Sequence, residues 1–292
     1  MEIEQIFANN VVRIIIESYN LCNRRCYMCP QSLNIRDNEY KEFPTSAFEK
    51  LIKDLAKIDY SNIIALGRYH EPLLFPEITL KRIRFIREEL PKSIILLNTN
   101  GDFITRDMVR ELSIAGLSDL KIMRYQNGDY SDSRAKDLCS SLIKQLDCSV
   151  IYESTIPGVI QKYNLEAVGK MKISVKSENY KVPSRGCDRG GLIENLQNYT
   201  RVLPCDLPIK NIDIDYNGNV LPCNNLLSDA LMHKPYIVGN IFEESIFQVY
   251  KKSMNSEFMR RIAKGDFSQD YICQKCSYLY DTGDKVFIQE EA

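Results

Sequence analysis

Short β-branched segments alternate with amphipathic segments over the first 180 residues of the chain. The β-branched segments predict strands at 11–19, 62–67, 93–99, 120–125, 149–153 and 172–176. Apolar residues at helical spacing predict helices between them, at 46–58, 78–90, 105–115 and 132–146. Repeated strand–helix units place their strands in a parallel sheet, so six of them predict an α/β fold, a partial (β/α)6 TIM-like barrel. Ligands of such a barrel bind at the carboxyl ends of its strands.

The alternation stops near residue 180, and the remaining chain reads as loops, a hairpin and one long helix. Asn217 and Gly218 form a two-residue hairpin signal between predicted strands at 211–216 and 219–223. The long helix is expected at 245–264. Because this region has little regular structure and holds five of the ten cysteines, we expect a metal-stabilised domain there. The predicted domains are therefore 1–180 and 181–292.

Charge and hydropathy exclude several classes of partner. The chain has 38 basic and 39 acidic residues, so it offers no overall field for a polyanion, and no nucleic-acid partner is expected. No apolar stretch approaches the roughly 20 residues of a membrane span, and the acidic N-terminus lacks the features of a signal peptide. We therefore expect a cytoplasmic protein without a membrane partner, in which clustered cysteines are metal or redox ligands rather than disulfides.

Cys22, Cys26 and Cys29 have the spacing C-x3-C-x2-C and follow the first predicted strand directly. Three thiolates can bind three irons of a [4Fe-4S] cluster and leave the fourth iron open to an external ligand. A structural zinc site would need a fourth ligand, which the neighbouring sequence does not supply. A zinc knuckle completed from a distant segment and three unrelated buried thiols remain the alternatives.

The cysteine loop after a first strand resembles the radical S-adenosylmethionine (SAM) superfamily. The resemblance implies that the open iron binds SAM and that an electron from the cluster cleaves it to a 5′-deoxyadenosyl radical. It further implies that Glu71, in the turn after the second strand, meets the methionyl amine, and that Asn100, after the third strand, contacts SAM. Met28 takes the place near the adenine where this superfamily usually has an aromatic residue.

Four further cysteines lie in the C-terminal region. Four thiolates suit either a fully ligated iron–sulfur cluster or a zinc ion, and their spacing alone does not distinguish the two. Beside a radical SAM core, the arrangement resembles the Twitch domain, the short form of the SPASM domain, which implies one auxiliary [4Fe-4S] cluster. The ligands that this resemblance implies are Cys205, Cys223, Cys273 and Cys276.

Several short motifs resemble the Twitch enzymes of aminoglycoside biosynthesis, the family of 2-deoxy-scyllo-inosamine dehydrogenases and related epimerases. These motifs are 71–74, 100–103, 189–192, 218–223 and 238–241. The resemblance implies a small carbohydrate or aminocyclitol substrate that loses hydrogen from a carbinol carbon, and a reductant such as flavodoxin or ferredoxin. It also implies that Arg189 faces the substrate hydroxyl; a surface ion pair is the alternative.

Cys187 is the fifth cysteine of the C-terminal region, and it lies in a glycine-rich loop between two arginines. A thiol there could return hydrogen to the opposite face of the substrate radical, as in the related epimerases, and we expect an epimerase on this basis. The alternative is dehydrogenation, in which an electron passes to the auxiliary cluster and a ketone forms. Cys139 and Cys148 are expected in the core, and His70 receives no role.

Two other functions remain open. A radical SAM enzyme that modifies a peptide would use the same cofactors on a different substrate. A zinc-binding module without catalytic activity would use the same cysteines, and the colour of protein purified without oxygen would distinguish it, because iron–sulfur protein is brown.

Overall fold

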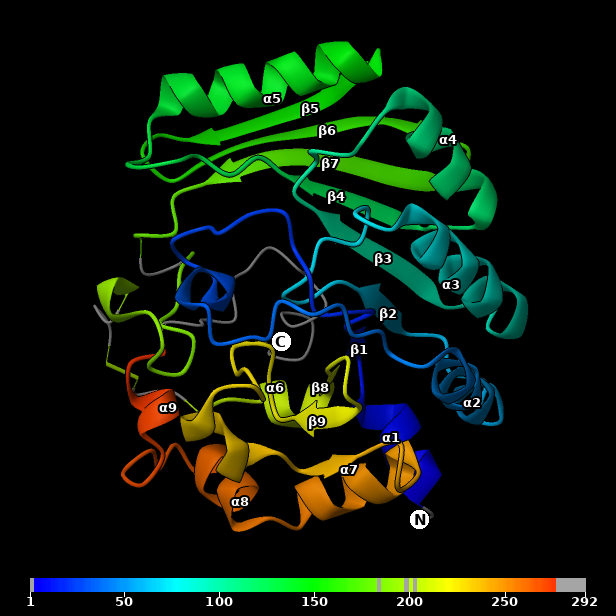
Figure 1. The fold of residues 1–292 in the computed structure, drawn as a ribbon, viewed down its shortest axis with the longest axis vertical. Helices are drawn as coiled ribbons and strands as arrows, with labels where there is room; N and C mark the ends of the chain where they lie inside the picture. Colours follow the sequence, from blue (N-terminus) through cyan, green and yellow to red (C-terminus); the bar gives the residue numbers. More distant parts are fainter. Residues whose placement is uncertain (1–2, 183–184, 197–199, 202–203, 277–292) are drawn as a thin grey trace.

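The computed structural model describes residues 3–182, 185–196, 200–201 and 204–276 (Figure 1). Within these residues, ten strands form one sheet in the order β10-β9-β8-β1-β2-β3-β4-β7-β6-β5. The strands are β1 (Arg13–Ile16), β2 (Ile63–Leu66), β3 (Ile94–Thr99), β4 (Asp119–Met123), β5 (Val150–Ile156), β6 (Ile160–Val168), β7 (Met171–Glu178), β8 (Asn211–Ile214), β9 (Asn219–Leu221) and β10 (Gly239–Asn240). The α-helices are α1 (Ile3–Asn10), α2 (Thr45–Ala56), α3 (Pro76–Glu89), α4 (Arg106–Ala115), α5 (Asp132–Leu146), α6 (Leu207–Lys210), α7 (Ile246–Met254), α8 (Glu257–Ala263) and α9 (Tyr271–Gln274). Three short 3-10 helices are η1 (Pro30–Leu33), η2 (Glu194–Leu196) and η3 (Leu231–Tyr236).

Six neighbouring strands of the sheet are parallel, in the order β8-β1-β2-β3-β4-β7. Helices α2, α3 and α4 follow β1, β2 and β3 and lie along the outer face of the curved sheet (Figure 1). This arrangement confirms the predicted α/β fold of partial-barrel type. The hairpin of β8 and β9 around Gly218 is also present, and β8 continues the parallel sheet beside β1.

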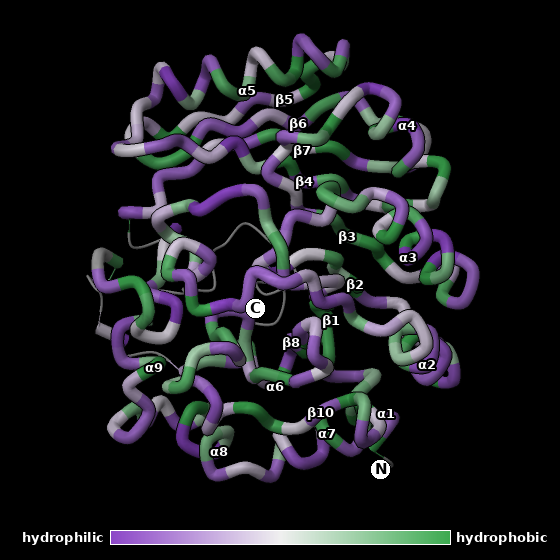
Figure 2. Tube along the Cα trace, viewed as in Figure 1, coloured by the Kyte–Doolittle hydropathy of each residue, from purple (hydrophilic) through white to green (hydrophobic). Residues whose placement is uncertain are grey.

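Local signals in the sequence explain where these helices begin and end. The Thr105 hydroxyl accepts a hydrogen bond from the Met108 backbone N–H at the start of α4, and Gly116 ends the helix with φ of 99°. Helix α5 spans the predicted residues, and the Ser131 hydroxyl caps it by accepting from the Arg134 backbone N–H. The alternation of the strands places one set of side chains in the main core and the other on the concave side of the sheet. Figure 2 shows the hydrophobic residues along β3.

The prediction of a parallel strand at 149–153 is wrong in orientation. This segment belongs to β5, which pairs antiparallel with β6, and β6 pairs antiparallel with β7. Strand β6 was not predicted. The Pro157-Gly158 dipeptide between β5 and β6 favours a tight turn, and a tight turn can join only antiparallel strands. The sixth parallel strand is β8, from the C-terminal region.

The single long helix predicted at 245–264 is two helices, α7 and α8, separated at Asn255. Ser245 caps α7 in a capping box with Gln248, and the Ser256 hydroxyl caps α8 by accepting from the Met259 backbone N–H. Serine side chains compete with a continuous helix for backbone hydrogen bonds, which explains the interruption.

Helix α1 lies beside α7 of the C-terminal region (Figure 1). Phe7 of α1 contacts Phe247 and Tyr250 of α7, with ring centroids 5.2 Å apart in both pairs. Phe7, Val249 and Tyr250 are fully buried in the main core, so the N-terminal helix fixes the C-terminal region against the sheet. Among the described residues, no helix combines the length and apolar character that crossing a membrane requires.

Candidate functional site

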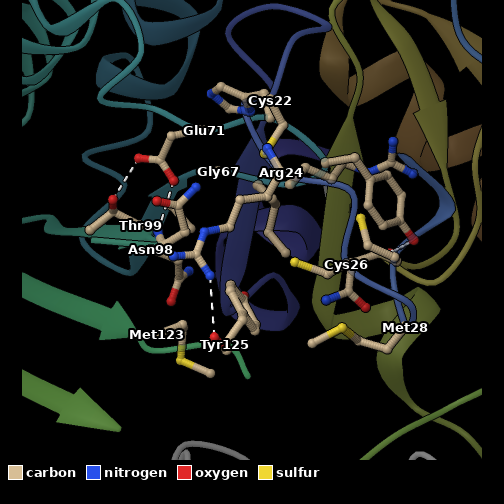
Figure 3. A pocket seen from close by; sticks show the side chains of 18 of the residues that line it. Cys22, Arg24, Cys26, Met28, Gly67, Glu71, Asn98, Thr99, Met123 and Tyr125 are labelled. Atoms are coloured by element: carbon tan, nitrogen blue, oxygen red, sulfur yellow. Dashed lines mark hydrogen bonds between the residues drawn. The ribbon is translucent and has the colours of Figure 1, made fainter. Parts of the chain in front are cut away.

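A cavity of about 320 Å³ opens at the carboxyl ends of the parallel strands. Its floor is the concave side of the sheet, where Ile15, Ala65, Leu96 and Met123 line it. All three cysteines of the C-x3-C-x2-C loop lie on its wall, and Figure 3 shows the loop facing the ends of β3 and β4. The structure therefore brings the predicted cysteines to the place where a barrel of this type binds ligands.

The cysteine loop is attached to the segment that follows β3. The Arg24 guanidinium forms an ion pair with the Asp102 carboxylate, Nε to Oδ2 at 2.6 Å, and donates to the Tyr125 carbonyl at 3.3 Å. Asn23 Nδ2 donates to the same carboxylate at 2.8 Å. Burial alone would raise the pKa of Asp102, but the hydrogen bonds from Arg24 and Asn23 hold it below its usual value. The Asp102 carboxylate thus holds the cysteine loop to the segment after β3 through its ion pair with Arg24.

The three thiols fit the requirements of a four-iron cluster with one open iron. Burial raises the pKa of Cys22 to about 11 and that of Cys26 to about 12, so cluster binding must displace their protons. The Arg24 backbone N–H donates to Cys22 Sγ at 3.4 Å, a contact that suits a sulfur ligand. Among the residues the structure describes on this wall, no fourth cysteine is present, which leaves room for an external ligand.

Glu71 and Asn100 lie together beside the cysteine loop. The Glu71 carboxylate accepts from Thr99 Oγ1 at 2.5 Å and from the Asn100 backbone N–H at 2.7 Å (Figure 3). Burial raises the pKa of Glu71, against the hydrogen bonds that favour its ionised form. The Asn100 side chain donates to Asn23 Oδ1 at 2.8 Å and accepts from the Asp102 backbone N–H at 2.9 Å. Both residues line the cavity, and the Asn100 amide also supports the cysteine loop.

Met28 lines the cavity at the other end of the cysteine loop. Its side chain is 4% exposed and packs in a small cluster with Ile193 and Leu196. The Met28 backbone carbonyl accepts a hydrogen bond from Arg189 Nε at 3.3 Å. This residue therefore connects the cysteine loop to the glycine-rich loop of the C-terminal region.

Arg189 lies on the cavity wall, where the sequence placed it. Its Nη1 donates to Asn225 Oδ1 at 2.7 Å, and its guanidinium stands 5.9 Å from the Tyr69 ring centroid. Arg189 has a left-handed φ of 52°, followed by Gly190 at 63°, where a Cβ would come within 2.7 Å of His233 Nε2. His233 Nδ1 accepts from the Leu227 N–H, so its Nε2–H donates to the Gly190 carbonyl and holds this tight loop.

Cys187 lies behind Arg189 rather than on the cavity wall. The thiol is 6% exposed and donates to Asn225 Oδ1 at 2.9 Å. Arg189 and Cys187 therefore share one acceptor. Cys139 is fully buried in the main core, and Cys148 packs against it, as predicted.

The four C-terminal cysteines also come together. They line one small cavity with Asn225 and Leu226, although they come from three separate segments: Cys205, Cys223, Cys273 and Cys276. Burial raises the pKa of Cys223 well above its usual value, and the Asn225 backbone N–H lowers it by donating to the sulfur. Within the described parts of the chain, no three His, Cys, Asp or Glu side chains converge on one point as a single metal ion requires. A four-iron cluster needs no such convergence, because each thiolate binds a different iron.

Three polar groups near the cavity were missed by sequence reasoning. Glu17 at the end of β1 is fully buried and forms a bidentate ion pair with Arg36, at 2.7 and 2.8 Å. Lys176 and Glu178 of β7 face the cavity and pair at 3.0 Å. No local motif marks any of these residues, although polar side chains at strand ends were a usable signal.

His70, to which no motif assigned a role, packs edge-on against Tyr19 with the ring centroids 4.6 Å apart. Burial lowers the pKa of His70 to about 3, so the imidazole is neutral. Neither ring nitrogen has a hydrogen-bond partner among the described residues.

Two family models match the chain in the regions that hold the two sets of cysteines. A model described as "Radical SAM superfamily" matches residues 16–123, and a model described as "Iron-sulfur cluster-binding domain" (SPASM) matches residues 205–277. The first range contains the three-cysteine loop and the second contains the four C-terminal cysteines. Together the two matches cover more than half of the chain.

The chain also has relatives that match along nearly its whole length. It is 22% identical over 265 residues to the S-adenosyl-L-methionine-dependent 2-deoxy-scyllo-inosamine dehydrogenase of Niallia circulans, over 90% of this chain and 92% of that protein. Its structure is similar to that of BtrN in complex with AdoMet and 2-DOIA, with a TM-score of 0.68, 21% identity and coverage of 92% and 94% of the two chains. An open conformation of BtrN matches with a TM-score of 0.58, 18% identity and coverage of 91% and 92%. The structural matches establish the fold.

Proposed function

Because the chain is a radical SAM enzyme with a SPASM iron–sulfur domain, we propose that it dehydrogenates a carbinol carbon of a small hydroxylated ring substrate. Its cofactors are [4Fe-4S] clusters and SAM. The observation that carries the proposal is the position of Arg189, between the Met28 carbonyl of the first cysteine loop and Asn225 beside the second set of cysteines. A substrate hydroxyl bound by Arg189 would lie between the two cluster sites.

The three thiolates of Cys22, Cys26 and Cys29 would hold the first cluster and leave one iron for SAM. When bound and reduced, this cluster supplies the electron that splits SAM into methionine and a 5′-deoxyadenosyl radical. We assign Glu71 to the methionyl amine, because its carboxylate is ionisable and lies beside the loop. Asn100 would contact SAM while it supports Asn23, and Met28 would lie against the adenine.

Arg189 would donate hydrogen bonds to the substrate hydroxyl and orient the carbinol C–H bond. A guanidinium stays protonated, so its role is to orient the hydroxyl and not to remove the proton. In total the substrate would give a hydrogen atom to the 5′-deoxyadenosyl radical, a proton to water and an electron to the auxiliary cluster, which converts the alcohol to a ketone. The cysteine set of Cys205, Cys223, Cys273 and Cys276 would hold the electron acceptor behind Asn225.

We propose an aminocyclitol-type substrate. The support is the similarity over 90% of the chain to a dehydrogenase of 2-deoxy-scyllo-inosamine. We also propose that the functional division lies near residue 180, with the SAM cluster in 1–180 and the auxiliary cluster in 181–292, although β8 extends the sheet of the first part.

Epimerisation is the second candidate outcome, because the Cys187 thiol shares the Asn225 acceptor with Arg189. A hydrogen donor must reach the substrate radical. The thiol is behind the cavity wall in this structure, so this outcome requires the 185–192 loop to move. Dehydrogenation requires no such movement, and we therefore favour it.

We expect the Cys187→Ala enzyme to form ketone from 2-deoxy-scyllo-inosamine at a yield within about twofold of the unchanged enzyme, since only a buried hydrogen bond is lost. The measurement is mass spectrometry of products from anaerobic turnover with dithionite and SAM in deuterated water. An inverted alcohol that carries solvent deuterium, and that disappears in Cys187→Ala, would instead establish epimerisation.

We propose that an acidic one-electron carrier, a flavodoxin or a ferredoxin, docks at a second groove beside the cysteine loop. Arg24, Arg25 and Arg134 line this groove, and Cys26 lines both the groove and the catalytic cavity. The groove is therefore a cationic surface next to Cys26, a proposed ligand of the first cluster, and such a surface would attract an acidic carrier.

Arg134→Glu should weaken this docking, and Arg110→Glu on α4, which lies outside the groove, is the matched control. Loss of roughly 1 kcal/mol of attraction predicts about a fivefold higher KM for the carrier. Turnover with dithionite should not change in either variant. An unchanged carrier KM at low salt would contradict docking at this groove.

A further inference from the structure

Asn225 lies between the catalytic cavity and the cavity of the C-terminal cysteines. The residue is 4% exposed, and its Oδ1 accepts hydrogen bonds from Arg189 Nη1 at 2.7 Å and from Cys187 Sγ at 2.9 Å. A guanidinium can only donate, so the side-chain atom that faces Arg189 must be the amide oxygen. Arg189 therefore fixes the orientation of the amide, and its nitrogen is directed away from the arginine.

The amide nitrogen of Asn225 is buried and has no hydrogen-bond partner among the described residues. Leaving such a donor unpaired in a buried place is unfavourable, so a partner outside the described residues is expected. Asn225 lines the same cavity as Cys205, Cys223, Cys273 and Cys276. The unpaired donor thus belongs to a residue on the wall of the cavity that the four thiols line.

We propose that Asn225 Nδ2 donates a hydrogen bond to a sulfur atom of the auxiliary cluster, and that Asn225 is a positioning residue which sets the reduction potential of that cluster. Arg189 and Cys187 hold the amide in the orientation that this bond requires. The inference rests on the presence of the auxiliary cluster and needs no particular substrate.

A hydrogen bond to a cluster sulfur stabilises the more negative, reduced state and raises the potential. Removing the donor should therefore make the auxiliary cluster harder to reduce. In the proposed dehydrogenation, transfer of an electron from the substrate to the auxiliary cluster depends on the reduction potential of that cluster. A lower potential would therefore also slow the dehydrogenation.

The test measures the midpoint potential of the auxiliary cluster by anaerobic redox titration followed by electron paramagnetic resonance. All variants carry Cys22→Ala, Cys26→Ala and Cys29→Ala, so that only the auxiliary cluster contributes to the signal. We expect Asn225→Leu to lower the equilibrium constant for reduction of the auxiliary cluster about tenfold. For a one-electron couple this corresponds to a fall of about 59 mV in the midpoint potential. Asn225→Asp keeps the acceptor for Arg189 but loses the donor and adds a negative charge, so its potential should fall further.

Asn224→Leu is the matched control, because Asn224 is the adjacent residue but lines the catalytic cavity. Its potential should equal that of the parent. Iron and sulfide content identifies any variant that has lost the cluster. As a second measurement, the parent exchanged into deuterated water should give in electron–nuclear double resonance a side-chain amide deuterium coupling that Asn225→Asp lacks, while couplings from backbone deuterons remain in both.

Unchanged potentials in Asn225→Leu and Asn225→Asp, at full cluster content, would overturn the proposal. So would identical deuterium couplings in the parent and in Asn225→Asp. Because neither measurement involves turnover, a wrong substrate assignment would leave these results unaffected, and the two proposals fail separately.

Discussion

We expect the Cys26→Ala enzyme to form no detectable 5′-deoxyadenosine when it is supplied with SAM and dithionite. Three thiolates line the catalytic cavity, and among the described residues of its wall no other cysteine could replace one of them. Two thiolates cannot hold a four-iron cluster in the arrangement that leaves a single iron open for SAM. The measurement is 5′-deoxyadenosine by liquid chromatography after anaerobic reconstitution, together with the iron content of the protein.

Cys139→Ala is the control for this experiment. Cys139 is a fully buried thiol in α5 and lies in the main core, away from both cysteine sets. Its replacement should leave 5′-deoxyadenosine formation intact while it lowers stability by about 1 kcal/mol through a small cavity. Cleavage of SAM at the normal rate by Cys26→Ala would show that this loop does not hold the cluster.

Much of the catalytic site could be predicted because its signals are local in the sequence. The cysteine spacing and its position after a strand predict three candidate ligands and the end of the sheet where the structure places them. Glu71 and Asn100 were predicted from the resemblance to the radical SAM superfamily, and the structure places both on the cavity wall, in segments that follow neighbouring parallel strands. The ligand pattern of the C-terminal cysteines also predicted their convergence from three segments.

The polar contacts between distant segments could not be predicted. Asn225 was overlooked because its partners, Arg189 and Cys187, lie more than thirty residues away. The ion pair of Glu17 with Arg36 likewise depends on how the cysteine loop returns to the sheet. Similarly, β8 of the C-terminal region pairs in parallel with β1 near the N-terminus. No periodicity within β8 specifies β1 as its neighbour.

Loss of Arg36 should destabilise the enzyme strongly. Its guanidinium pairs with Glu17, which is fully buried, and its Nε contacts Asp229 at 2.9 Å, so it joins the cysteine loop to the C-terminal region. Arg68, at 3.6 Å, is the remaining cation near Glu17. Arg36→Met leaves a buried carboxylate without its main partner, which predicts a loss of about 3–5 kcal/mol in the free energy of unfolding at pH 7.

The pH dependence distinguishes this ion pair from simple packing. Burial would raise the pKa of Glu17, but Arg36 lowers it from 4.5 to about 2, so its stabilisation is present above pH 4.5 and is lost as the pH falls towards 2. In Arg36→Met burial dominates and Glu17 takes up a proton more easily, so the difference in stability between the two enzymes should narrow on acidification. Anaerobic urea titrations of the cluster-loaded enzymes at several pH values, followed by circular dichroism, measure this difference. The double variant Glu17→Gln, Arg36→Met should regain part of the lost stability at pH 7, because it no longer buries the Glu17 carboxylate without its main partner. A pH-independent difference between the enzymes with and without Arg36 would mean that Arg36 acts through packing alone.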